Sequence, residues 1–190
     1  MNEMEKGKVL TQLARAAIAS RLQITAPFPN SSVNWLHKLG ASFVTLTRDG
    51  QLRGCMGSLE ARRNLVDDVQ ANAVAAAFED YRFPPLTSDE YLRIAIEVSV
   101  LSALEPMFVS TEEEAMNQLR QGIDGLVIEY GMHRATFLPQ VWEQLPEPQA
   151  FLAHLKIKAG LPADFWHPNM QLFTYQVHQY HEQEQFGHEE

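Results

Sequence analysis

The sequence predicts an α+β fold, in which an antiparallel or mixed sheet packs with helices set between groups of strands. The first indication is a hairpin: two alternating apolar runs meet at Asp49-Gly50, where glycine tolerates a positive φ. The second is a strongly apolar alternating run over Arg93–Ser102, in which Ile94 and Ile96 point to one face. Hairpins interleaved with helices argue against a doubly wound parallel sheet.

The elements follow from periodicity and from their end signals. A helix over Lys6–Leu22 is rich in Ala, Leu and Arg, and a second, Ala-rich helix begins at Asn64 and ends near Asp80. Thr87-Ser88-Asp89-Glu90 has the form of a capping box. Further helices are expected after Thr111 and over Gln149–Ala159, with Gly160 as the stop. Strands are expected over Ala41–Thr47, Gln51–Leu59, Arg93–Ser102, Gly125–Tyr130, His133–Leu138 and Gln171–His178, and Glu105 is expected in a turn.

Composition restricts the class of protein. The chain has 190 residues, of which 45% are hydrophobic, so its length favours one domain, or a large lobe with an appendage, around a real core. A formal net charge of −9 argues against nucleic acid and anionic membranes as partners. The polar N-terminus has no signal-peptide core, and no apolar window is long enough to span a bilayer, so a cytoplasmic location without membrane contact is expected.

Catalytic and metal signatures are few. The single cysteine, Cys55, excludes an internal disulfide and any multi-cysteine cluster, and in the cytoplasm it is expected to be a free thiol. The chain lacks the Gly-rich phosphate loops, the H-E-x-x-H zinc motif and the G-x-S-x-G elbow. Three histidines near the C-terminus, His178, His181 and His188, lie in or next to a polar tail over 181–190 and are better interpreted as part of this polar end than as a metal site. We therefore predict no metal and no cofactor.

Four stretches occur together in one order: Leu52–Gly57, Asp80–Leu86, Ile96–Ser102, and Gly122–Leu126 continuing through Thr136–Trp142 to Lys158–Leu161. In this order, over about residues 8–180, they resemble one family, the AMMECR-type domain, whose bacterial and archaeal members are also called AmmeMemoRadiSam system protein A. Met56 stands where the family usually has Ile, and Ala135 stands where it usually has Gly. If position 135 needs a positive φ, alanine there costs about 1 kcal/mol.

The resemblance implies an α+β fold with a larger and a smaller lobe and with the motif residues gathered near their junction. It also implies association with a Memo-type protein and a radical-SAM protein. It does not supply a reaction.

Candidate site residues lie in these motifs, and each has a structural alternative. Strand alternation places Arg53 and Cys55 on one face, where Arg53 favours the thiolate; the alternative is a packed thiol. Gly54 leaves little bulk beside the thiol, and a glycine inside a strand marks a bulge or a place where a ligand or another backbone comes close. Arg82 either binds a carboxylate or phosphate or locks a corner with Asp80.

Polar residues elsewhere complete the candidate set. Glu97 lies on the less apolar face of its strand and either faces solvent or pairs with an arginine, Arg53 or Arg82. Thr136 and Gln140 either line a small-molecule site or form a packing corner, and His133 is the one histidine inside a family motif.

Three functions remain open at this point. The favoured one is an accessory module that binds a small ligand or a peptide end in a cleft between the lobes. The second is an enzyme that uses Cys55 as nucleophile and Arg53 as its activator. The third is a scaffold without a ligand.

Overall fold

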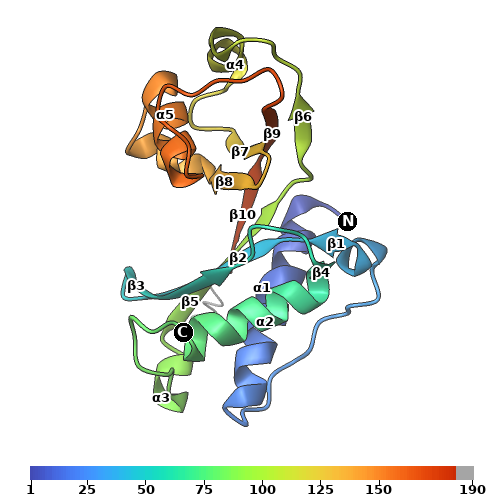
Figure 1. Cartoon of the computed structure of the whole chain (residues 1–190). Coiled ribbons are helices and arrows are strands. Elements are labelled where there is room, and N and C mark those ends of the chain that lie inside the picture. The colour runs from blue at the N-terminus through green and yellow to red at the C-terminus, as the bar shows by residue number, and fades with distance from the viewer. Residues whose placement is uncertain (183–190) are drawn as a thin grey trace. The chain divides into compact units, whose positions relative to one another are not determined.

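Residues 1–182 are described by a computed structural model, which divides into two units (Figure 1). Unit 1 comprises Met1–Val100 and the chain from His178 onward, and unit 2 comprises Leu101–Val177. Each combines helices with an antiparallel sheet, which confirms the α+β class. Of the expected polar tail, residues 183–190 lie outside the described part. His181 and Glu182, by contrast, belong to unit 1, where His181 ends a strand.

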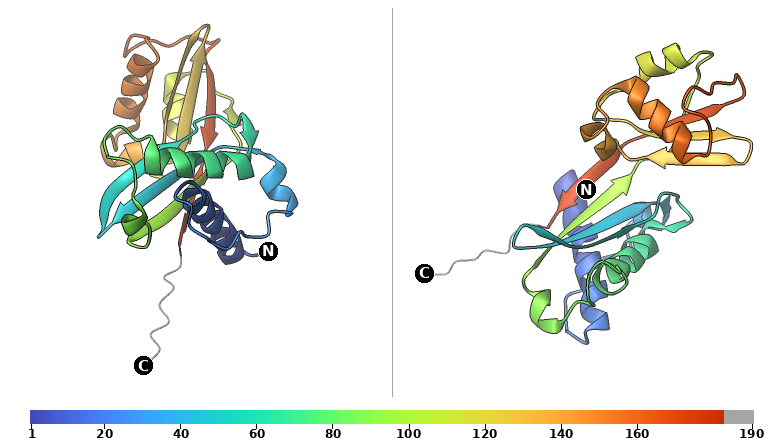
Figure 2. Two further views of the ribbon diagram at one scale, coloured as in Figure 1. Left: turned by 90° about the horizontal axis from the view of Figure 1, so that it is seen from below. Right: turned by 60° about the vertical axis from the view of Figure 1, so that its left-hand side comes forward.

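Unit 1 is a four-stranded sheet with two long helices on one face. Its elements are α1 (Glu3–Arg21), η1 (Asn34–His37), β1 (Leu39–Gly40), β2 (Ser42–Arg48), β3 (Gln51–Gly57), β4 (Arg63–Asn64), α2 (Leu65–Phe78), α3 (Ser88–Tyr91), β5 (Ile94–Leu101) and β10 (Val177–His181). The strand order is β10-β5-β2-β3, and β1 pairs with β4 separately. Figure 2 shows α1 and α2 on the same side of this sheet. Val44, Ile96 and Val98 face the helices and are buried in the core that the sheet shares with them.

The hairpin between β2 and β3 forms as predicted, but it contains an irregularity. Asp49 and Gly50 have φ of 52° and 74°, the double positive φ of a tight hairpin turn. Leu46 pairs with Gly54, whereas Thr47 pairs with Leu52. Residue 53 is therefore extra on β3 and forms a β-bulge, which redirects its side chain.

Unit 2 has a second four-stranded sheet, in the order β6-β9-β7-β8. Its elements are β6 (Glu105–Met107), α4 (Glu112–Gln118), β7 (Gly125–Tyr130), β8 (His133–Phe137), η2 (Pro139–Glu143), α5 (Pro148–Lys158) and β9 (Gln171–Tyr175). Its core contains Trp142 stacked on Phe151, with ring centroids 3.9 Å apart. Lys156 is fully buried there and donates hydrogen bonds to Glu112 and to the carbonyl of Phe165.

Three expectations about unit 2 and its borders are corrected. Glu105 is in strand β6, paired with Thr174, and not in a turn. The final strand is divided into β9 and β10, which belong to different sheets. Ala135 is an ordinary strand residue paired with Ile128, without positive φ, so replacing the usual glycine strains nothing there. No helix in the described part of the chain has the length and apolarity needed to cross a membrane.

Candidate functional site

Cys55 lies on the sheet face opposite α1 and α2. A side chain at the preceding residue, Gly54, would meet the backbone of α2, so position 54 faces the helices. Because neighbouring strand residues point to opposite faces, the Cys55 side chain points away from the helices. Its neighbour across the ladder is Thr45, whose Oγ1 lies 3.4 Å from the half-buried Sγ. The two form a non-hydrogen-bonded pair, in which side chains approach closely, because the Cys55 N–H points outward from the sheet edge. We call this side of the sheet the thiol face; it carries Phe43, Thr45, Cys55, Glu97 and Ser99.

Asp80 joins the edge of β3 to the turn that follows α2. It is buried, with 4% exposure, and accepts the N–H of Cys55 at 3.0 Å. It also accepts the N–H, Nε and Nη2 of Arg82 at 3.2, 3.0 and 2.7 Å. The hydrogen bonds from the Arg82 side chain hold the pKa of Asp80 well below its usual range. Burial opposes this shift, and the backbone N–H groups of Cys55 and Arg82 reinforce it. Asp80 is therefore a permanent anion that positions Arg82.

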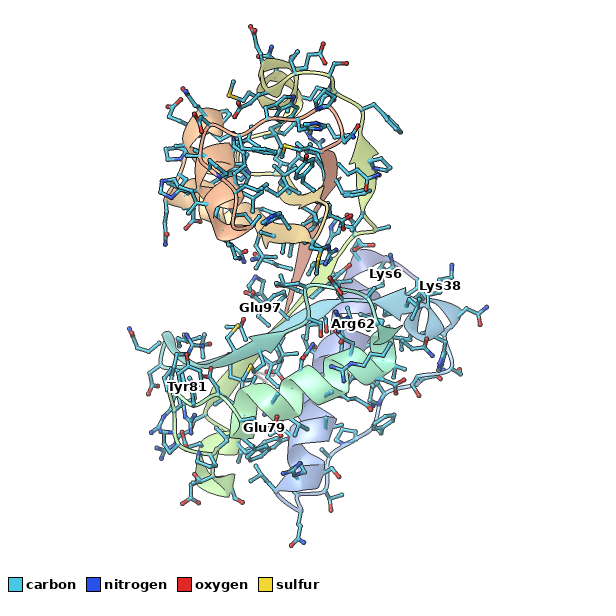
Figure 3. All side chains as sticks on the ribbon, viewed as in Figure 1. Lys6, Lys38, Arg62, Glu79, Tyr81 and Glu97 are labelled. Atoms are coloured by element: carbon cyan, nitrogen blue, oxygen red, sulfur yellow. The ribbon has the colours of Figure 1, made fainter. Side chains whose placement is uncertain are left out.

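Arg82 is the cation of this corner, linked through Asp80 to the backbone N–H of Cys55. Its side chain is 46% exposed, and its guanidinium carbon lies 5.5 Å from the ring centroid of Phe83. Hydrogen bonding to Asp80 raises the pKa of Arg82 against an opposing desolvation, and the charges of Asp80 and Cys55 contribute in the same direction. The neighbouring Tyr81 is 94% exposed and is labelled in Figure 3. The predicted corner between Asp80 and Arg82 is therefore present, and it leaves a guanidinium in solvent.

The expectation that Arg53 activates Cys55 is corrected. The bulge turns Arg53 into the protein, where its Nε and Nη2 donate to Glu90 at 2.7 and 3.1 Å and Nη2 also donates to the carbonyl of Pro84. The hydrogen bonds from Arg53 lower the pKa of Glu90 to about 2, although burial opposes the shift. Nη1 of Arg53 is buried and has no hydrogen-bond partner among the described residues. Arg53 is thus bound to Glu90, and its guanidinium carbon lies 5.8 Å from the ring centroid of Phe83.

Of the alternatives open for Gly54, the structure shows the close approach of another backbone and not space for a ligand. A Cβ at this position would lie 2.1 Å from the carbonyl oxygen of Ala76 in α2. The missing side chain therefore allows the strand to contact the helix. Gly57 has a comparable role on the thiol face, where the ring of Phe43 occupies the space of its absent side chain.

Glu97 lies on the thiol face in β5, directly across Thr45 from Cys55. Figure 3 places it on the side of the sheet away from α2. Its carboxylate accepts a hydrogen bond from Ser99 Oγ at 3.4 Å and lies 3.2 Å from Nδ1 of His181. Neither Arg53 nor Arg82 is its partner, which corrects that expectation.

The remaining predicted site residues belong to unit 2, where His133 and Thr136 form hydrogen bonds. His133 Nδ1 lies 2.9 Å from the carbonyl of Ala159 at the end of α5, and Thr136 shares a 2.9 Å hydrogen bond with the hydroxyl of Tyr175. Gln140 is an exposed residue of η2. Their binding roles remain predictions.

Three residues that contact candidate site residues are not predicted from the sequence as part of a site: Thr45, Glu90 and His181. Thr45 was visible as a strand residue, but its register with Cys55 was not. Glu90 was found as a capping residue, which it is, but its bonds to Arg53 depend on tertiary structure. His181 was assigned to the tail. The described residues contain no group of three or more His, Cys, Asp or Glu side chains placed to hold a metal ion.

The fold and the site together define a two-unit α+β protein with a free thiol and an arginine held beside it. The model of the AMMECR1 family matches residues 11–180, so the chain belongs to the AMMECR1 family. A protein of Methanothermobacter thermautotrophicus is 35% identical over 182 residues, covering 94% of this chain and 95% of its own. Protein MJ0810 of Methanocaldococcus jannaschii is 37% identical over 166 residues, covering 86% and 83%. The crystal structure of the uncharacterized protein PH0010 from Pyrococcus horikoshii is similar with a TM-score of 0.75 and 32% identity, over 95% of this chain and 93% of that one.

Proposed function

We propose that the protein is a ligand-binding module whose site is the corner formed by Cys55, Asp80, Arg82 and Phe83. The ligand is a small molecule or a peptide end that presents a carboxylate or phosphate to Arg82. The observation that carries this proposal is the two-point hydrogen bond between Arg82 and the buried Asp80. It fixes a guanidinium at the surface beside a thiol, so little side-chain freedom is lost when an anion binds.

The chemistry of the corner favours an anion. Asp80 is buried and uses its oxygens within the protein, whereas the Arg82 side chain is 46% exposed. The group that meets solvent is therefore the cation. Arginine has five N–H donors, and the bonds to Asp80 engage Nε and Nη2, which leaves Nη1 for a planar anion. The Phe83 ring, 5.5 Å from the guanidinium carbon, adds aromatic surface, the usual accompaniment of a polar anchor in a small-molecule site.

The test is a titration of the full chain with succinate and with inorganic phosphate, followed by amide chemical shifts. The proposal expects saturable shifts centred on Cys55 and Arg82, and their loss in Arg82→Gln. Arg120→Gln is a matched control, because Arg120 is 55% exposed and also bonds a buried carboxylate, Asp124, in unit 2. Shifts that survive in Arg82→Gln, or no shifts with either anion, would refute the proposal.

A second candidate function, an enzyme with Cys55 as nucleophile, is favoured by the position of Arg82. Asp80 links this cation to the backbone N–H of the half-buried, free Cys55, and reactive cysteines occur in electropositive, partly exposed surroundings of this kind. This candidate expects iodoacetamide to label Cys55 faster than it labels N-acetylcysteine at neutral pH, and Arg82→Gln to slow the labelling. A rate at or below that of N-acetylcysteine excludes it and leaves the binding function in place.

The partners also belong to this proposal. The family resemblance supports a cytoplasmic accessory protein that presents its ligand to Memo-type and radical-SAM proteins. Co-expression with these two proteins from the same genome, followed by affinity purification, tests the association. Recovery of neither partner with the native chain contradicts it.

A further inference from the structure

The thiol face has a charged group, Glu97, without a permanent counter-ion among the described residues. The Glu97 side chain is 25% exposed in the middle of the sheet, and its oxygens contact only a neutral hydroxyl, Ser99, and the imidazole of His181. Among residues 1–182, no lysine or arginine forms an ion pair with it. A carboxylate withdrawn from water in this way favours a cation or strong hydrogen-bond donors.

The register places Glu97 and Cys55 along one line across the sheet. Cys55, Thr45 and Glu97 are direct neighbours on three adjacent strands, all on the thiol face. Two strand spacings separate Cys55 from Glu97, which is about 10 Å. Arg82 lies beyond Cys55 at the edge of β3, held there by the bond between Asp80 and the Cys55 N–H. The face therefore has a negative pole at Glu97, and a positive pole, Arg82, lies beyond its edge next to Cys55.

The surface between the poles is polar. The Thr45 hydroxyl lies midway, and the Phe43 ring covers Gly57 beside it, so one flank of the line is closed by an aromatic wall. A hydroxyl between two charged poles suits a ligand with hydrogen-bonding groups along its length. A peptide backbone has such groups, and an alkyl chain does not.

We propose that the occupant of the thiol face is a short extended peptide with its free ammonium at Glu97 and its carboxylate at Arg82. This inference rests on the proposed anion site at Arg82 and specifies its ligand class. An extended chain advances about 3.3–3.6 Å per residue, so three or four residues span the two poles. The charges are complementary at both ends, and the free thiol lies beneath the C-terminal half of the peptide.

The test uses oligoglycines as probes, because they have the two terminal charges and no side chains. Diglycine to pentaglycine are titrated into the full chain by isothermal calorimetry. Triglycine or tetraglycine is expected to bind most tightly. N-acetylation or C-amidation of that peptide removes one terminal charge, and each is expected to weaken binding about tenfold, the value of one charge-assisted hydrogen bond.

Variants assign each end of the peptide to its pole. In Glu97→Gln the N-acetylated and free peptides should bind equally, while the effect of C-amidation persists; in Arg82→Gln the pattern should be reversed. Glu129→Gln, a half-exposed strand glutamate of unit 2, is the control for Glu97 and should change neither comparison.

The outcomes separate this inference from the function on which it rests. If succinate binds at Arg82 but N-acetylation of the peptide has no effect, the peptide is refuted and the anion site stands. If affinity does not depend on peptide length, the two-pole geometry is wrong. If neither succinate, phosphate nor any oligoglycine binds at about 10 mM, both the inference and the proposed function are refuted.

Discussion

Replacing Gly54 by alanine tests the close contact between β3 and α2. The new Cβ would lie 2.1 Å from the carbonyl oxygen of Ala76 and 3.0 Å from its carbonyl carbon. Both sides of this clash are main chain, one in a buried helix and the other in a strand held by its ladder, so neither can rotate away. The strand must shift from the helix, and we expect a loss of about 3 kcal/mol in the free energy of unfolding, the upper end of overpacking costs.

Two other glycines of the same hairpin provide graded controls. At Gly57 the added Cβ would meet the ring of Phe43 at 2.2 Å, but a half-buried side chain can turn aside, so about 1 kcal/mol is expected. At Gly50 nothing lies within 4 Å, and only the φ of +74° opposes alanine, which again costs about 1 kcal/mol.

Urea denaturation followed by circular dichroism measures all three variants under one condition. The order expected is a large loss for Gly54→Ala and small, similar losses for Gly57→Ala and Gly50→Ala. If Gly54→Ala loses no more stability than Gly50→Ala, the strand is not close-packed on the helix and the reasoning fails.

Two further predictions concern buried charges. Glu90 has a pKa lowered from 4.5 to about 2 in the folded state, chiefly by hydrogen bonds from Arg53, so its stabilisation is complete above pH 4.5 and is lost as pH falls towards 2. Glu90→Gln should cost about 2 kcal/mol at pH 7, and its difference from the native chain should vanish near pH 2; a difference independent of pH contradicts the ion pair. Lys156→Ala should lower the free energy of unfolding by about 3 kcal/mol, because it empties a buried site and leaves Glu112 unpaired. Lys156→Met fills the site, so its loss should be less than half as large. Equal losses in thermal denaturation would show that charge pairing, not packing, dominates.

The local elements were predictable because their signals are local. The Asp49-Gly50 turn needs positive φ, which glycine permits, and the capping box at Thr87 is complete within four residues. The apolar alternation in β5 gives the buried face correctly. Each of these features depends on residues a few positions apart, so one sequence contains enough information to predict them.

The site was harder, because its geometry depends on one inserted residue. Strict alternation from Cys55 places Arg53 on the thiol face, and the bulge at Arg53 breaks that alternation. The bulge is compatible with the contact of Gly54 on α2 and with the bonds of Arg53 to Glu90, which are made 37 positions away in the sequence. Alternation therefore places Arg53 on the thiol face, whereas the arginine that is linked to Cys55 through Asp80 comes from the turn after α2.

The division of unit 1 between the two ends of the chain has a consequence for synthesis. Strand β5 ends as the chain enters unit 2, and its neighbour β10 begins only after unit 2 is complete. Until then a growing chain has β5 as an unpaired sheet edge, a template for wrong pairing with other chains. The arrival of β10 closes that edge, and Glu182 then binds Arg15 of α1 and the N–H of Ile96 in β5. Translation must therefore pass through the whole of unit 2 before the first unit can finish folding.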